Sequence, residues 1–120
     1  MPKTQILDPV VALKLDRVRH FCIDFNALAL MEERTGRNIL DPRSFEDVNM
    51  RTMRTIIHCA LRHEDDTLTE HDVGALISPT NLPYVMTRLS EAWRATNGEA
   101  SEDPFARGMM ADLMQIQHPS

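Results

Sequence analysis

The feature that most constrains the fold is a change of character inside one uninterrupted stretch, residues 19–36, RHFCIDFNALALMEERTG. Its first half is aromatic and β-branched, which favours a strand. Its second half is rich in Ala, Leu, Met and Glu and is closed by Gly36, which favours a helix with a left-handed C-terminal residue. Asn26 or Asp24 can cap that helix. We therefore expect a strand that runs almost directly into a helix.

A second strand precedes this junction. Val11, Leu13 and Leu15 alternate with polar or small residues, which is the period of a half-buried strand. Asp16-Arg17 predicts a tight turn, and residues 18–25 predict the return strand of a hairpin. On that strand one side is expected to carry Phe21, Ile23 and Phe25, and the other His20 and Cys22.

The remainder of the chain predicts helices. Asn49 is expected to cap an amphipathic helix whose buried face carries Met53, Ile56, Ile57, Ala60 and Leu61. Thr69 and Asp72 have the spacing of a capping box for a short helix that stops before Pro79. The longest helix is expected to be capped by Thr80 or Asn81, to end at Gly98, and to bury Leu82, Val85, Met86, Leu89 and Trp93. The predicted fold is mainly α (α+β), a small N-terminal β-hairpin followed by about four or five helices.

We expect three regions along the 120 residues. Residues 1–10 are predicted to be a flexible N-terminal arm, and residues 11–98 a helical domain with an N-terminal hairpin. Residues 99–120 are predicted to be an acidic linker followed by an amphipathic C-terminal helix. Composition fits a globular domain, with 42% hydrophobic and 26% charged residues.

Charge is distributed unevenly. Residues 1–60 carry nine Lys and Arg against eight Asp and Glu, and residues 61–120 carry four against ten. Because nucleic-acid affinity comes mostly from neutralised phosphates, this pattern disfavours a nucleic-acid partner.

No apolar run approaches the length of a membrane span, and the two cysteines form no disulfide framework. We expect a soluble, intracellular protein with reduced thiols.

Candidate chemical sites are few. Cys59 and His63 share one helical face, with His58 and His71 near in sequence, but paired zinc-ligand spacings are lacking. A buried Cys59 beside a solvent-facing His63 is therefore favoured over a metal site. The turn that begins at Asp65 lacks the Gly of a calcium loop and is expected to be a helix-capping turn.

Nucleophilic catalysis is not indicated either. His20 and Cys22 lie on the same side of a strand, but neither an orienting third group nor an oxyanion hole is evident nearby. No glycine-rich phosphate loop is present. We predict that the protein is not an enzyme and uses no cofactor.

The order of these segments resembles the tail assembly chaperones of long-tailed bacteriophages and of phage-like gene transfer agents. The resemblance covers about residues 11–97. It rests on residues 25–28 with Glu32 and Thr35-Gly36, on residues 54–57 with Ala60-Leu61, and on Leu68-Thr69 with Asp72-Val73 and Leu76-Ile77.

The resemblance implies a non-enzymatic chaperone that acts in the cytoplasm of the bacterial host. It would bind the tape-measure protein, help recruit tail-tube subunits and be absent from the finished virion. A soluble holder of a long amphipathic helix needs an apolar docking surface and net charge. The candidate contact residues are Phe105, Met109, Met110, Leu113, Met114 and Ile116. That segment could instead pack back as a last core helix. Alternative functions are a structural or adaptor component of the tail, or a Cys/His metal-binding protein, and the hairpin edge could template self-association.

Overall fold

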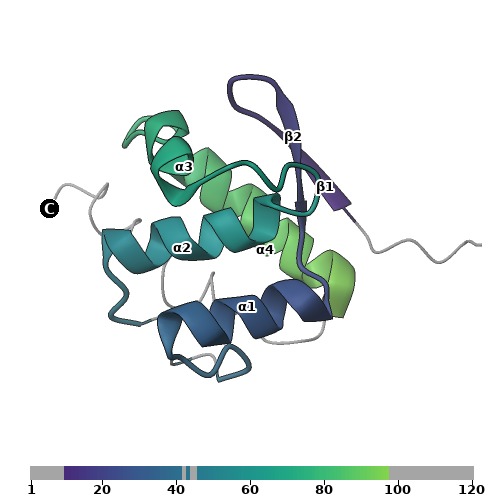
Figure 1. The fold of residues 1–120 in the computed structure, drawn as a ribbon, viewed down its shortest axis with the longest axis vertical. Helices are drawn as coiled ribbons and strands as arrows, with labels where there is room; N and C mark the ends of the chain where they lie inside the picture. Colours follow the sequence, from purple (N-terminus) through teal and green to yellow (C-terminus); the bar gives the residue numbers. More distant parts are fainter. Residues whose placement is uncertain (1–9, 42, 44–45, 98–120) are drawn as a thin grey trace, which may run out of the picture.

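A computed structural model describes residues 10–41, 43 and 46–97 (Figure 1). In this part of the chain an antiparallel hairpin is followed by four α-helices. The elements are β1 (Val10–Lys14), β2 (Val18–Cys22), α1 (Phe25–Thr35), α2 (Met50–Leu61), α3 (Glu70–Leu76) and α4 (Leu82–Asn97). The predicted mainly helical α+β class is confirmed, as is the hairpin at its N-terminal end. The hairpin begins at Val10, which the sequence had placed in the N-terminal arm.

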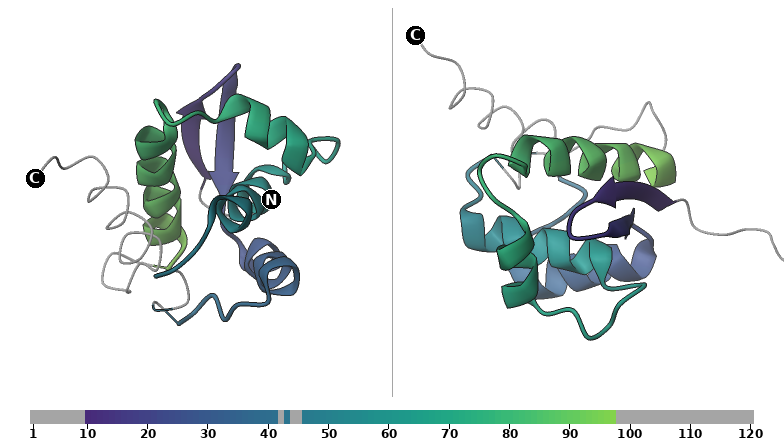
Figure 2. Two further views of the ribbon diagram at one scale, coloured as in Figure 1. Left: turned by 90° about the vertical axis from the view of Figure 1, so that its left-hand side faces the viewer. Right: turned by 90° about the horizontal axis from the view of Figure 1, so that it is seen from above.

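Helix α2 lies at the centre of the molecule. It contacts α1, α3 and β2, while β1 packs on α4, so that the hairpin lies between α2 and α4 (Figure 2). The five predicted face residues of α2 are buried. Thr55 and His58, which lie outside that predicted face, are buried as well, because α1 and α3 cover the other sides of α2.

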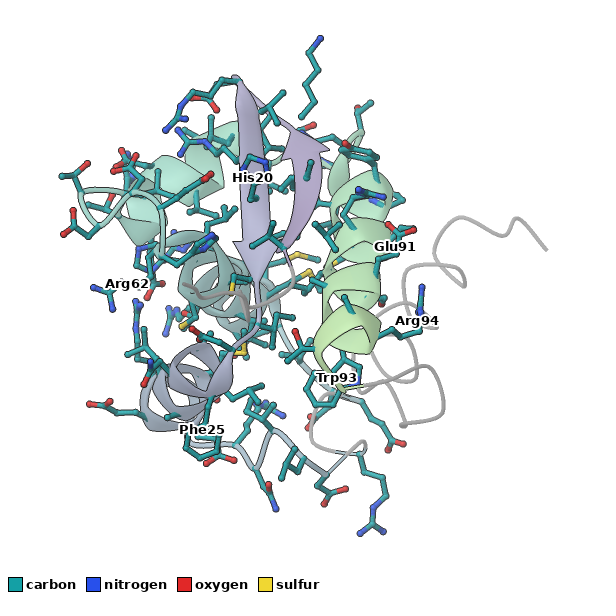
Figure 3. All side chains as sticks on the ribbon, turned by 90° about the vertical axis from the view of Figure 1, so that its right-hand side faces the viewer. His20, Phe25, Arg62, Glu91, Trp93 and Arg94 are labelled. Atoms are coloured by element: carbon teal, nitrogen blue, oxygen red, sulfur yellow. The ribbon has the colours of Figure 1, made fainter. Side chains whose placement is uncertain are left out.

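Strand β2 ends at Cys22, three residues earlier than predicted, and a short junction leads into α1. Only Ile23 and Asp24 separate the two elements, and Asp24 caps α1 by accepting a hydrogen bond from the Ala27 N–H at 2.8 Å. The prediction that Phe25 continues the strand and packs beside Phe21 is wrong. Phe25 is the first residue of α1 and is 83% exposed, because the cap turns the chain into a helix before the Phe25 side chain can face the core (Figure 3).

The predicted caps decide most helix ends. Gly36 ends α1 in the left-handed conformation with φ of 69°, where a side chain would be strained. Asn49 caps α2 through the Thr52 N–H, and Thr69 and Asp72 form a reciprocal capping box on α3. Before α4, the Asn81 side chain accepts from the Ser78 N–H and donates to the Leu76 carbonyl, so it joins the start of α4 to the end of α3.

Helix α4 buries the face that its periodicity predicts. Leu82, Val85, Met86, Leu89 and Trp93 are all below 9% exposed. Trp93 lies toward the C-terminal end of α4 (Figure 3). None of the helices in the described part of the chain has the length and apolarity that crossing a bilayer requires.

Candidate functional site

Three helices enclose an apolar groove with a cavity volume of about 710 Å³. Its apolar wall is formed chiefly by Met50, Met53 and Ile57 of α2, Ile77 after α3, and Leu82 and Pro83 of α4. We call it the α2–α3–α4 groove. Met50, at its lip, is 61% exposed, although it is a large apolar side chain. Such a concave apolar surface is typical of sites that accept the apolar face of a helix.

Gly74 of α3 and the chain that follows α3 shape this groove. Gly74 lines the groove, and a Cβ placed on it would lie 3.3 Å from Cδ of Arg54. Any larger residue would therefore narrow the space or displace Arg54. After Leu76 the chain becomes extended at Ile77, and Pro79 prevents α3 from continuing toward α4.

Arginines of α2 make one rim of the groove positive. Arg51 is exposed, and its guanidinium forms no ion pair with any residue in the described part of the chain. Arg54 Nε lies 3.6 Å from a carboxylate oxygen of Glu70 but donates no hydrogen bond among the described residues. The groove thus joins an apolar wall to the exposed guanidinium of Arg51 and to the Arg54 guanidinium beside Glu70.

A polar network beneath this rim fixes α1, α2 and α3 to one another. Glu70 of α3 forms an ion pair with Arg34 of α1 and accepts a hydrogen bond from the Thr55 hydroxyl of α2 at 2.9 Å. Arg34 Nη1 also lies 2.8 Å from Nδ1 of the buried His58. The His58 Nε2 atom lies 2.6 Å from the Leu68 carbonyl oxygen. Because the carbonyl only accepts and the guanidinium only donates, His58 is neutral with its proton on Nε2.

Burial sets the protonation states in this network. Burial lowers the pKa of His58 below its usual value, and the positive charges of Arg34 and Arg62 lower it further. Burial likewise raises the pKa of the Cys59 thiol. Cys59 is 2% exposed and therefore stays a protonated, inaccessible thiol rather than a nucleophile.

The Cys59 and His63 pair is not assembled into a metal site in this structure. Cys59 is buried, whereas His63 is exposed. Within residues 10–41, 43 and 46–97, no cluster of three or more His, Cys, Asp and Glu side chains could hold a metal ion. The favoured interpretation, a buried cysteine beside a solvent-facing histidine, matches this geometry.

His20 is engaged in hydrogen bonds and Cys22 is buried. Glu64 accepts the backbone N–H of His20 at 2.9 Å, and its other oxygen lies 3.0 Å from His20 Nδ1. Cys22 is 4% exposed. His20 is thus tied to the turn after α2 rather than directed at the thiol.

The acidic turn before α3 is a capping turn, as the sequence predicted. Asp65 accepts hydrogen bonds from the Thr67 N–H and hydroxyl, and lies 3.5 Å from the buried Arg19 of β2. Asp72 is occupied by the Thr69 cap. These carboxylates serve backbone and guanidinium partners inside the fold.

Side chains cover part of both edges of the hairpin. On β1, the Tyr84 hydroxyl accepts the Lys14 N–H at 2.9 Å, and Arg88 Nε donates to the Ala12 carbonyl at 2.8 Å. On β2, Glu64 accepts the His20 N–H. These contacts occupy backbone groups that a strand of a second copy would need.

The candidate contact residues of the C-terminal segment lie outside the described residues. These are Phe105, Met109, Met110, Leu113, Met114 and Ile116. The sequence did not predict the α2–α3–α4 groove, because its wall combines residues from position 50 to position 83 on three helices. Two features of the sequence relate to the groove. Met50 is an apolar residue just before the predicted buried face of α2, and Gly74 places a residue without a side chain within the short helix α3.

Comparisons of the chain with protein-family models, with curated proteins and with solved structures found no match. The fold and the groove themselves define the class of protein. It is a small α+β domain with an apolar groove between three helices, bordered by arginines.

Proposed function

We propose that this protein is a non-enzymatic tail assembly chaperone that holds helical stretches of the tape-measure protein in the α2–α3–α4 groove. The observation that carries the proposal is the groove itself, about 710 Å³ of mainly apolar wall beside Arg51 and Arg54. An amphipathic helix would bury its apolar side chains there and place a carboxylate from its polar flank against the arginines.

The chemistry of the groove defines the segment it would accept. The partner is expected to present apolar side chains at helical spacing, flanked by Asp or Glu. Long amphipathic helices aggregate through such apolar faces when they are unpartnered, so covering them before the tail tube encloses them is a sufficient role. The tape-measure identity, recruitment of tail-tube subunits, action in the host cytoplasm and absence from the finished virion all follow from the family resemblance.

The test is a pull-down from cells that express the tagged chain with its native gene cluster, with bound chains identified by mass. The wild-type protein should recover a very long, helix-rich chain. Met50→Glu places a charge on the apolar lip of the groove, and should reduce recovery about tenfold, the effect of losing roughly 1.4 kcal/mol of binding free energy. Helix α2 should tolerate it, because an acidic residue in the first turn is favourable.

Leu40→Glu is the matched control, because Leu40 is 68% exposed and does not line the groove. Equal loss of the partner in both variants would contradict groove docking. Recovery of no helical partner by the wild-type chain would contradict the chaperone role. Stoichiometric amounts of the chain in purified particles would replace it with the role of a structural adaptor.

A further inference from the structure

We propose that residues 104–117 of the same chain occupy the α2–α3–α4 groove in the free protein, so that an incoming helical partner must displace them. The displacement step rests on the proposed function, whereas occupancy by the chain's own segment does not. Three observations carry the inference: the position of the groove relative to the end of α4, the apolar spacing of residues 105–116, and the charges on both sides.

The first observation is reach. The groove includes Leu82 at the start of α4, and the described chain ends at Asn97, the last residue of that helix. A rise of 1.5 Å per residue makes α4 about 23 Å long. Residues 98–104, if extended at about 3.3–3.6 Å each, span about 23–25 Å. The linker is thus long enough to return the following segment to the groove.

The second observation is the apolar pattern of the segment. Phe105, Met109, Leu113 and Ile116 recur at intervals of four, four and three residues, which places them on one helical face. The groove presents Met50 and Met53, and methionine adapts to irregular apolar partners. Gly108 lowers the helix propensity of the segment, which favours its displacement by a partner with higher helix propensity.

The third observation is charge complementarity. From residue 98 onward the chain carries four carboxylates, Glu99, Glu102, Asp103 and Asp112, against one arginine, Arg107. The groove rim carries Arg51, which has no ion-pair partner in the described part of the chain. Three of these carboxylates, Glu99, Glu102 and Asp103, lie in the linker before the segment, whereas residues 104–117 carry one carboxylate and one arginine and are neutral. An acidic linker that passes the positive rim favours docking of the segment that follows it. Tethering adds an effective concentration in the millimolar range.

The test uses the full chain with a nitroxide spin label on Gln117→Cys. The two native cysteines can stay in place, because Cys22 and Cys59 are only 4% and 2% exposed and should not react with the spin label. Methyl NMR of Met and Ile residues then reports which side chains lie near the label. Strong broadening of the Met50 and Met53 methyl signals is expected, relative to Met31, which does not line the groove.

The control carries Met109→Asp and Leu113→Asp in the same labelled chain, and should reduce this broadening several-fold. Two results would overturn the inference. One is equal broadening in the chain with and without the Asp substitutions. The other is broadening that appears when a spin-labelled chain is mixed with a separate isotope-labelled chain, because the occupant would then be a second copy.

The same variants separate this inference from the proposed function. If the groove is masked for about nine tenths of the time, the Asp double variant should recover the helical partner with about tenfold higher apparent affinity. A chain whose own segment docks but which captures no partner, even with the Asp substitutions, would retain the inference and lose the proposed function. Partner capture without intramolecular broadening would do the reverse.

Discussion

At the scale of single residues, the strand-to-helix junction depends on one carboxylate. The sequence offered Asp24 and Asn26 as caps, and the structure uses Asp24, whose Oδ1 accepts the Ala27 N–H. We predict that Asp24→Ala lowers the free energy of unfolding by about 1 kcal/mol. Asn26→Ala should change it by less than about 0.5 kcal/mol, because Asn26 is exposed within α1. Chemical denaturation of both variants decides the matter, and equal losses would show that the cap is misassigned.

His58 gives the protein a pH-dependent stability. Its folded-state pKa lies below the usual value of about 6.5, so the unfolded chain binds the proton more readily than the folded chain. The stability that the neutral His58 side chain contributes is fully present above about pH 6.5, and it is lost as the pH falls toward the folded-state pKa. The surrounding charges are Arg34 of α1, Arg62 at the end of α2 and Asp72 of α3.

We therefore expect the denaturation midpoint of the wild-type chain to fall between about pH 7.5 and about pH 5.5. His58→Gln, which cannot take up the proton, should show a flatter profile over the same range. The window avoids the carboxyl groups whose pKa values are lowered, such as Asp16 at about 2. An identical slope in the wild type and His58→Gln would assign the pH dependence to other groups.

At the scale of elements, α3 is the helix that depends most on its neighbours. It has seven residues, too few for an isolated helix, and buries chiefly Val73. Glu70 fixes it to Arg34 and Thr55. We predict that Glu70→Gln lowers the free energy of unfolding by about 1–2 kcal/mol, because the partly buried guanidinium of Arg34 loses its counter-charge.

The comparison is Glu91→Gln, which removes an ion pair with Arg88 inside the single helix α4. That change should cost less than about 0.5 kcal/mol. Hydrogen exchange should also accelerate in the α3 amides of Glu70→Gln and not in Glu91→Gln. Unchanged exchange in α3 would mean that Val73 and the capping box suffice to hold this helix.

Local signals explain how much of the fold could be predicted. Helix starts at Asn49 and Thr69 and the C-terminal Gly36 are recognisable because each depends on contacts within four residues. Phe25 was misplaced because its β-propensity was outweighed by the cap one residue earlier. The groove could not be predicted, because its shape depends on how α2, α3 and α4 pack.

At the scale of the whole molecule, the uneven charge of the sequence acquires a location. The basic residues of the first half include Arg51 and Arg54, which border the groove, and the acidic excess lies largely in the second half. Positive charge beside the groove favours acidic segments, both on a partner helix and in the chain's own C-terminal region. Binding of an acidic amphipathic helix should weaken at high salt, since part of its affinity comes from exposed charges.

The hairpin edges determine whether copies of the chain can join through β-strands. Tyr84 and Arg88 of α4 engage outward-facing backbone groups of β1 at Lys14 and Ala12. We predict that the double variant Tyr84→Phe and Arg88→Met exposes this edge and increases self-association, because an unpaired strand edge accepts another strand. Sedimentation of the wild-type chain and the double variant over a range of concentrations measures this difference.

The double variant keeps the apolar parts of both side chains, so its core packing should be preserved. A Tyr84→Phe variant with Arg88 intact is the intermediate case, and should associate less than the double variant. If the wild-type chain associates as strongly as the double variant, the copies join through a surface other than the β1 edge.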